Sequence, residues 1–217
     1  MERLYYLLML SDGMWSGRRV YVVGGGPSLR DFDWSRLTGE SWIGCNQAWI
    51  HDPPVSISLD KKYHRVICKD SRWRDKKHIK IWIRVPRDNL EHVPKAPGDV
   101  TILVTKQDRS WSRSIADGIV HGTNTGTCAI NLACILAGPG GDVRLLGFDM
   151  RGELGKTANW HNAYSFRRNG DFAYKRYCKD IERHVGSIDC KIFNISHGSA
   201  TALKCFPIIS SFDEGLA

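Results

Sequence analysis

The chain has 217 residues, of which 42% are hydrophobic and 25% charged, and these proportions are typical of a globular protein with its own buried core. No run reaches the roughly 18 apolar residues that a membrane-spanning helix needs, so the sequence argues against a membrane span. Its 31 lysines and arginines against 23 aspartates and glutamates give a net charge of +8. This excess favours a polyanionic partner such as a nucleic acid, a nucleotide or a phosphorylated acceptor, with a merely solvated basic face as the alternative.

The first 16 residues contain one apolar run, at positions 5–10. The run has no basic segment of any length before it and no small-residue cleavage site, so it does not fit a secretory signal peptide. We expect residues 1–16 to form an N-terminal extension, either a short docking helix or a leader, ahead of a single domain at 17–217.

Short apolar runs bounded by turn residues recur along this domain. They predict seven strands, at Arg19–Val23, Ser41–Cys45, 55–59, 79–85, Val100–Val104, 143–146 and Lys191–Ile195. Several are largely apolar, which is typical of parallel strands covered on both faces, whereas 79–85 alternates and is predicted to lie at an edge.

Helical patterns lie between some of the predicted strands. The clearest is Thr125–Ala137, which Gly138 is expected to end, and a second at about 171–185 has Phe172, Tyr177 and Ile181 on its apolar face. The prolines at 87–98 predict a loop, and the segment 106–123 is predicted to be a mobile flap. Strands that alternate with helices predict an α/β fold, Rossmann-like, with a mainly parallel sheet and helices on both faces.

The chain has seven cysteines, an odd number. No two of them form a C-x-x-C pair, and several lie within apolar runs. This usage is typical of buried free thiols in a reducing compartment, and it argues against a disulfide framework or a zinc site. We therefore expect a cytoplasmic protein.

Three glycines, Gly24, Gly25 and Gly26, follow the first predicted strand, and Pro27 and Ser28 come next. Ligands of parallel α/β sheets bind beyond the carboxyl ends of the strands. Glycine lets backbone N–H groups approach a phosphate without steric obstruction. The loop therefore predicts a phosphate or nucleotide site, with a tight strand-to-helix turn as the alternative.

The loop matches neither common glycine-rich nucleotide motif. A dinucleotide fingerprint that starts at Gly24 needs glycine or alanine where Leu29 stands, and Asn46 stands near the end of the second strand, where the fingerprint has an acid. The Walker form is absent because no GK[ST] follows. A G-x-S-x-G elbow and an H-E-x-x-H motif are also absent, so serine hydrolases and zinc proteases are unsupported.

The loop and several later motifs resemble the bacterial lipooligosaccharide sialyltransferases. The matching segments are GGGPSL at 24–29, DWSRL at 33–37, CNQ at 45–47, NTG at 124–126 and LLGFD at 145–149. The resemblance covers roughly residues 19–162, with gaps. The same pattern occurs in a broader family that contains the archaeal 6-hydroxymethylpterin pyrophosphokinase and many phage-encoded proteins of unknown role.

The resemblance implies a glycosyltransferase-A-like variant of the fold, a nucleotide-sugar donor, and a reaction with no metal and no tightly bound cofactor. Gly25 stands where the sialyltransferases have asparagine. Asp60, at the end of the third strand, also stands where they have asparagine, and an aspartate there is closer to the pyrophosphokinase branch. In that alternative, Asp60 and Asp149 would hold Mg²⁺ for a diphosphate transfer from ATP.

The residues predicted to hold the nucleotide stand at strand ends and at a helix start. Asn46 offers an amide donor and acceptor to a base or ribose, or only forms a turn. Thr125 and Gly126 open the clearest helix, whose N–H groups attract an anion, and Thr125 is also a candidate N-cap. Asp149 either orients a base or binds a sugar hydroxyl, or it holds the loop that follows it. The predicted nucleotide-binding residues are Gly24, Gly25, Gly26, Pro27, Ser28, Asn46, Asp60, Thr125, Gly126 and Asp149.

The predicted catalytic groups follow the sixth strand. Trp160 offers a face on which an acceptor sugar or a base can stack, and His161 titrates near neutrality, so it is predicted to take the proton of a hydroxyl acceptor. Arg167 and Arg168 are predicted to stabilise the leaving diphosphate, or else to start a solvated helix. His197 is the second candidate base.

Asp31 and Asp33 have the D-x-D spacing that holds a metal in many glycosyltransferases, but Asp33 fits better as the cap of a short helix at 34–37, so we predict no metal there. The leading prediction is a nucleotide-sugar-dependent glycosyltransferase that acts on a hydroxyl acceptor, which can be anionic. The alternatives are Mg²⁺-dependent, pyrophosphokinase-like transfer and a non-catalytic phage-type protein that binds nucleotides or nucleic acid. The sugar, the acceptor and the oligomeric state stay open.

Overall fold

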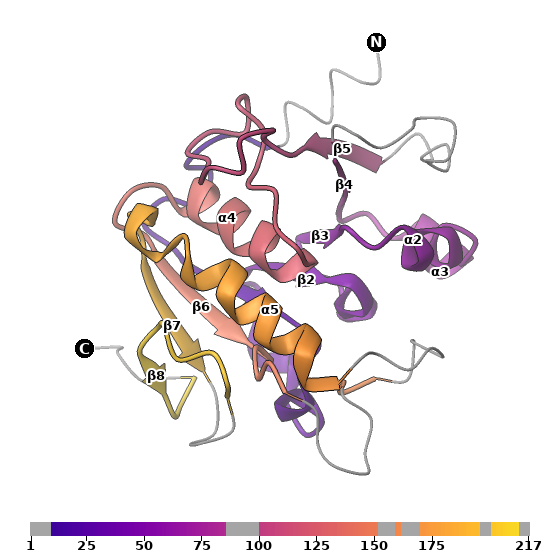
Figure 1. Cartoon of the computed structure of the whole chain (residues 1–217). Helices are drawn as coiled ribbons and strands as arrows, with labels where there is room; N and C mark the ends of the chain where they lie inside the picture. Colours follow the sequence, from indigo (N-terminus) through magenta and orange to yellow (C-terminus); the bar gives the residue numbers. More distant parts are fainter. Residues whose placement is uncertain (1–9, 86–99, 152–158, 162–169, 196–200, 213–217) are drawn as a thin grey trace.

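The structure is a computed structural model, and it describes residues 10–85, 100–151, 159–161, 170–195 and 201–212 (Figure 1). Strands from these residues form one sheet in the order β5-β4-β3-β2-β1-β6-β7-β8, and every neighbouring pair is parallel. The strands are β1 (Arg19–Val23), β2 (Ser41–Cys45), β3 (Val55–Ser58), β4 (Ile79–Arg84), β5 (Val100–Val104), β6 (Asp142–Leu146), β7 (Lys191–Ile195) and β8 (Ile208–Ile209). The predicted mainly parallel, Rossmann-like α/β fold is confirmed.

The direction in which strands are added reverses once. β1 to β5 extend the sheet one way, and β6 to β8 extend it the other way, beginning beside β1. Ligands of open parallel sheets bind at such a reversal, beyond the carboxyl ends of the two strands. Val23 pairs with Leu146 in the β1–β6 register, so the loops after these two strands start side by side.

Four strands have the predicted bounds, and β3, β4 and β6 differ from them by one residue at one end. The short strand β8 has no counterpart among the predicted strands. The prediction that 79–85 lies at an edge is wrong, because β4 pairs with both β3 and β5. Its alternation reflects a buried lysine: Lys80 is 2% exposed, and its Nζ donates to the carbonyl oxygens of Arg74 and Lys76.

One face of the sheet carries the main core beneath α4 (Thr125–Ala137). This helix packs on β1, β2, β3 and β6, whose side chains on this face include the fully buried Val22, Ile43 and Leu145. The predicted bounds of α4 are confirmed, and Gly138 ends the helix at φ 75°. α5 (Gly170–Glu182) lies beside α4 (Figure 1).

The predicted apolar face of α5 is partly wrong. Phe172 is 79% exposed, whereas Cys178 and Ile181 are buried. The helix ends at Glu182, short of the predicted 185, because the chain turns at 183–184 and continues as a 3₁₀ helix over Val185–Ser187. The buried side of α5 therefore faces α4 through its last two turns.

The opposite face of the sheet is covered by short helical segments. The 3₁₀ helices Pro27–Leu29 and Trp34–Leu37 contribute Leu29 and Leu37 to a second cluster with Tyr21 and Trp42. Two helices that the sequence reading does not predict follow β3: α2 (Lys61–Ile67) and α3 (Ser71–Asp75). Helical segments thus cover both faces.

α2 and α3 are fixed to the sheet by a few aromatic and aliphatic side chains. Tyr63, Ile67 and Trp73 are buried in a cluster with Trp49. The Lys80 ammonium lies 5.5 Å from the centre of the Trp73 ring, on the side of β4 opposite to the main core. Both helices begin at aspartate N-caps, Asp60 and Asp70.

The core begins before residue 17. Leu10 and Trp15 are buried in the main cluster, and the backbone N–H groups of Gly13 and Trp15 donate to carbonyl oxygens near the C-terminal end of α4. The described part of the expected N-terminal extension therefore packs as part of the domain. Residues 1–9 of that extension lie outside the described residues.

The segment 106–123, predicted to be a mobile flap, is attached to α4 through Asn131. The Asn131 side chain accepts a hydrogen bond from the Val120 backbone N–H (2.7 Å) and donates one to the Ser112 carbonyl oxygen (2.8 Å). Ile119 and Val120 are fully buried. Motion of the whole segment would have to break these contacts. The predicted loop at 87–98 lies outside the described residues.

In the described part of the chain, none of the helices is long and apolar enough to cross a membrane. The seven cysteines are free thiols, and four of them are buried.

Candidate functional site

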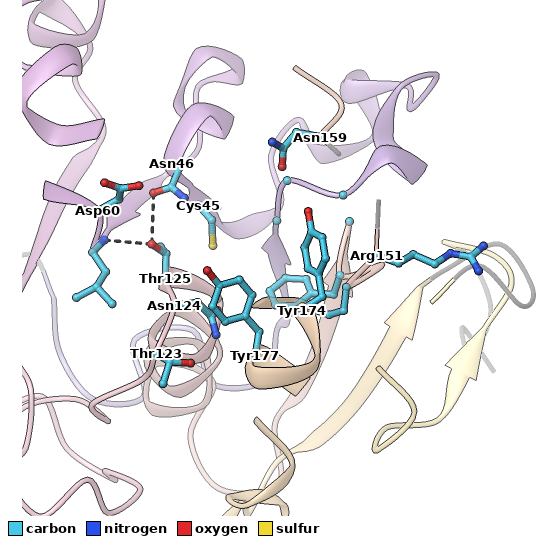
Figure 2. Close-up of a pocket in the computed structure, with 18 of the residues that line it drawn as sticks. Cys45, Asn46, Asp60, Thr123, Asn124, Thr125, Arg151, Asn159, Tyr174 and Tyr177 are labelled. Atoms are coloured by element: carbon cyan, nitrogen blue, oxygen red, sulfur yellow. Dashed lines mark hydrogen bonds between the residues drawn. The ribbon is translucent and has the colours of Figure 1, made fainter. Parts of the chain in front are cut away.

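A cavity of about 360 Å³ lies beyond the carboxyl ends of β1 and β6, at the reversal of the strand order. This volume is within the range of small-molecule sites. Figure 2 shows the ends of β2 and β3 and the start of α4 on one side, and tyrosines of α5 on another. The lining residues are Gly24, Gly25, Gly26, Cys45, Asn46, Leu59, Asp60, Thr123, Asn124, Thr125, Gly126, Gly147, Phe148, Met150, Arg151, Asn159, His161, Tyr174 and Tyr177.

The three loop glycines line the cavity, but they are glycine for different reasons. A Cβ at Gly24 would lie 2.7 Å from the Gly147 carbonyl oxygen. A Cβ at Gly26 would lie 2.1 Å from Asp149 Oδ2 and 2.6 Å from the same carbonyl. At Gly25 the nearest atom would be Asn159 Oδ1 at 3.0 Å, followed by His161 Nε2 at 3.8 Å. Gly24 and Gly26 therefore let the β1 and β6 loops approach each other, whereas Gly25 is close only to the ends of the Asn159 and His161 side chains.

Asp149 holds the glycine loop from behind. It is 2% exposed, and its Oδ2 accepts a hydrogen bond from the Ser28 backbone N–H at 2.9 Å. Asp149, Pro27 and Ser28, all predicted to bind nucleotide, do not line the cavity. The Asp149 carboxylate thus holds the glycine loop, whereas the structural alternative expected it to hold the loop that follows Asp149.

Trp160 also supports the glycine loop. Its backbone N–H donates to the Gly25 carbonyl oxygen (3.1 Å), and its indole Nε1 donates to the Gly24 carbonyl oxygen (3.2 Å). The ring packs against Trp34 and His51, with centroids 5.0 Å and 5.4 Å away. The side chain predicted to stack on an acceptor sugar or base is therefore outside the cavity lining and fixes the loop instead.

The N-terminus of α4 forms the opposite wall. Asn124 is its N-cap, since its side-chain oxygen accepts from the Thr127 backbone N–H at 3.1 Å. The prediction that Thr125 is the cap is wrong, because its hydroxyl is used elsewhere. Gly126 lies where a Cβ would come within 2.9 Å of the Phe148 ring, so its backbone approaches the loop after β6 closely. The exposed N–H groups and positive dipole end of a helix at this place favour an anion.

A chain of hydrogen bonds orients the Asn46 amide (Figure 2). Leu59 N–H donates to Thr125 Oγ1 (3.1 Å), so the Thr125 hydroxyl proton points to Asn46 Oδ1 (3.3 Å). Asp60 N–H likewise donates to Ser58 Oγ (3.3 Å), and the Ser58 hydroxyl donates to the same Oδ1 (2.8 Å). Two hydroxyl donors thus fix the amide oxygen, and the NH₂ group of Asn46 is the end available to a ligand.

Asn46 also has an unusual backbone, with φ 51°. This left-handed conformation is several-fold enriched in asparagine and aspartate among residues other than glycine. Asp60 has a local structural role beside its place in the cavity lining, because its Oδ1 accepts the backbone N–H groups of Lys62 (2.9 Å) and Tyr63 (3.1 Å) and caps α2.

α5 supplies site residues that the sequence reading does not assign. Tyr174 and Tyr177 line the cavity, with ring centroids 6.2 Å apart in an edge-to-face arrangement. Asp180, which is 3% exposed, accepts hydrogen bonds from the Thr123 backbone N–H (2.6 Å) and the Thr127 hydroxyl (2.9 Å). It thereby holds the loop before α4 in place.

The titratable groups of the lining differ in what they can do. Burial raises the pKa of the Cys45 thiol far above its ordinary value, so Cys45 is a neutral wall residue and not a nucleophile. His161 lines the cavity with its Nε2 directed near Gly25. Arg151, whose role the sequence reading misses, is the one arginine of the lining among the described residues, and its side chain extends away from Asn46 in Figure 2.

The other predicted residues either lie outside the described residues or have a structural role. Arg167, Arg168 and His197 lie outside the described residues. Asp33 caps the 3₁₀ helix Trp34–Leu37 by accepting from Ser35 N–H, as predicted. In the described part of the chain no three His, Cys, Asp or Glu side chains are grouped closely enough to hold a metal ion. Asp60 and Asp149 do not fit a shared Mg²⁺ site, because Asp149 is buried behind the loop.

No protein-family model, curated protein or solved structure matches the chain significantly.

Proposed function

We propose that the protein is a glycosyltransferase that binds the nucleotide part of a nucleotide-sugar in the cavity between the glycine loop and the α4 N-terminus. The observation that carries the proposal is the position of the cavity. It lies at the reversal of the strand order, with the bare backbone of Gly25 on one wall and a helix N-terminus on the other. Both walls can receive phosphate oxygens with backbone N–H groups.

The rest of the lining fits a nucleoside. The Asn46 NH₂ group can donate to a base carbonyl or a ribose oxygen, because Ser58 and Thr125 occupy its amide oxygen. Tyr174 and Tyr177 offer aromatic rings with polar hydroxyl ends, which suit the face of a base or sugar. The donor sugar and its anomeric carbon would then lie towards Gly25 and His161.

His161 is the proposed general base. In the reaction, the acceptor oxygen forms a bond to the anomeric carbon while its proton passes to the neutral imidazole of His161. The bond between the anomeric carbon and the phosphate oxygen breaks, and its electron pair leaves with the nucleotide. The α4 N-terminus stabilises the charge on that phosphate, with Arg167 and Arg168 as the proposed cationic partners.

The test is donor turnover with a panel of CMP-, UDP- and GDP-sugars. Turnover is measured as release of free nucleotide when the sugar is transferred to water or to an added acceptor. One donor is expected to turn over, in EDTA as well as in Mg²⁺. His161→Ala is expected to lower the rate about 100-fold or more while leaving the dissociation constant of the nucleotide unchanged, because a general base contributes to the rate and not to binding of the leaving group.

Turnover by His161→Ala at the wild-type rate would remove this residue from the chemistry. Release that stops in EDTA, or release that requires ATP, would favour the pyrophosphokinase-like alternative. His161→Gln is the matched variant, since it retains a polar side chain of similar size without an imidazole.

A further inference from the structure

Most of the net charge of the protein is concentrated in one short segment. Residues 61–77, which cover α2, α3 and the turns after them, contain eight lysines and arginines and only two aspartates. They therefore hold six of the eight net positive charges of the chain. The remaining 200 residues carry a net charge of only +2, so this segment holds most of the positive excess that attracts anions.

The basic side chains of α2 lie on its outer side. Lys62 and Arg65 are exposed and lie three residues apart on α2, and Lys69 is exposed in the turn after the helix. The apolar side chains Tyr63 and Ile67 point the other way, into the cluster that fixes α2 to the sheet. α2 and α3 project from the main body in Figure 1, so their outer side is open to a large partner.

Few countercharges lie among these residues. Asp70 pairs with Arg72 (2.7 Å), and Asp52 pairs with Lys76. Arg65, Lys69, Arg74 and Lys77 have no ion pair with any described residue. Exposed cations without a countercharge attract an anionic partner.

The basic surface begins at the rim of the cavity. Asp60 lines the cavity and is also the N-cap of α2, so Lys61 and Lys62 follow directly from a lining residue. An extended polyanion lying along α2 would therefore pass the mouth of the cavity.

We propose that the outer surface of residues 61–77 binds the phosphate backbone of a nucleic acid and guides it to the cavity, which makes a nucleic acid the acceptor class. The naming of the acceptor rests on the proposed glycosyltransferase function, whereas the binding itself does not. A membrane is the less suitable partner, because a helix that lies on lipid presents an apolar face to it. The apolar face of α2 is buried, and Val66 is the one large apolar side chain of α2 on its outer side.

The experiment is fluorescence anisotropy of the full chain with a labelled single-stranded oligonucleotide and with its duplex, over a series of salt concentrations. The test variant is Arg65→Glu/Lys69→Glu. The matched control is Lys191→Glu/Lys204→Glu, which makes the same change in net charge at two other exposed positions. Binding by the wild type should weaken steeply with salt. The test variant should bind about tenfold or more weakly, with a salt slope smaller by about 1.4 for a single strand, and the control should lose much less.

The proposal is overturned if the wild type binds neither strand nor duplex at low salt, or if both variants lose affinity equally. It is also overturned if the wild type sediments with anionic phospholipid vesicles but binds no oligonucleotide. Calorimetry with free nucleotides separates this proposal from the one on function. The test variant should bind nucleotide as the wild type does. If the wild type binds oligonucleotide but no nucleotide, the proposed glycosyltransferase function fails and the proposed nucleic-acid surface stands.

Discussion

At the scale of single residues, the glycine loop combines a structural and a ligand-facing requirement. A Cβ added at Gly26 would clash with Asp149 Oδ2 and with the Gly147 carbonyl oxygen, and neither group can move without disturbing the end of β6. Gly25 faces the cavity, where its nearest neighbour is the end of the Asn159 side chain. Adjacent substitutions should therefore have different effects.

Gly26→Ala should lower the free energy of unfolding by about 2 kcal/mol or more, because overpacking against fixed backbone cannot relax. Gly25→Ala should change it much less, while weakening nucleotide binding. Urea unfolding of both variants measures the first effect, and calorimetry with nucleotide measures the second. Equal stability of the two variants would contradict the close approach of the β1 and β6 loops at Gly26.

The Asn46 amide gives a second prediction at this scale. Asn46→Asp keeps the left-handed backbone and still accepts hydrogen bonds from Ser58 and Thr125, but it replaces two N–H donors by a negative charge. Nucleotide affinity should fall about tenfold or more, since a lost donor leaves a ligand oxygen unpaired. The melting temperature should change little. Wild-type affinity in this variant would exclude Asn46 as a ligand contact.

At the scale of elements, α2 carries a buried histidine that makes the fold sensitive to acid. His64 is 2% exposed between Trp73 and Trp82, with ring centroids 6.3 Å and 4.1 Å away. Burial lowers its pKa from 6.5 to about 4. In the unfolded chain the imidazole takes up a proton near pH 6.5, so its contribution to stability is complete above that pH and is lost as the pH falls towards 4.

The loss should reach about 3 kcal/mol by pH 4. His64→Phe should flatten the dependence of the unfolding free energy on pH between 6.5 and 4, as urea unfolding at several pH values would measure. Part of the slope should remain, because burial also lowers the pKa values of His51 and His184. An unchanged slope in His64→Phe would show that His64 is already protonated in the fold.

α5 and α4 are joined at the site by one buried carboxylate. Asp180→Ala would leave the Thr123 N–H and the Thr127 hydroxyl without their acceptor and would unpair Arg183, which lies 2.7 Å from Asp180. We expect a loss of about 3 kcal/mol in unfolding free energy, together with weaker nucleotide binding, since the start of α4 would no longer be fixed. Normal nucleotide affinity would show that the α4 start holds its position without α5.

Elements with a clear apolar signal could be predicted from the sequence to within a residue, as for α4 and β7. α2 and α3 could not, because three side chains, Tyr63, Ile67 and Trp73, carry their packing within a highly charged stretch. The assignment of β4 to an edge was wrong for a related reason. A lysine alternating with isoleucines looks solvated, whereas Lys80 is satisfied by two carbonyl oxygens of the turn after α3.

At the scale of the whole molecule, the predictable part of the site is the part that follows strand ends. Gly25, Asn46 and Thr125 come directly after apolar strands or at a helix start, so topology alone brings them together. Tyr174 and Asp180 reach the site only because α5 folds back over α4, and no spacing in the sequence signals this. The hydrogen bonds by which Asp149 and Trp160 hold the glycine loop likewise depend on tertiary contacts that the sequence does not signal.

The cavity and the main excess of positive charge lie in different parts of the molecule. The cavity is built at the centre of the carboxyl edge of the sheet, and the excess of positive charge is concentrated in the segment 61–77 beside it. A small anionic donor and a large anionic acceptor would thus be held by different parts of one domain, which is why binding of the two can be measured separately.

The most direct test of the central claim is isothermal titration calorimetry of cytidine, uridine, guanosine and adenosine phosphates into the wild type and into Gly25→Val. Nucleotides with one base are expected to bind to the wild type, and binding is expected to be lost in Gly25→Val, since the added side chain enters the cavity beside Asn159 and His161. Failure of every nucleotide to bind the wild type, or equal affinity in Gly25→Val, would contradict a nucleotide site at this loop.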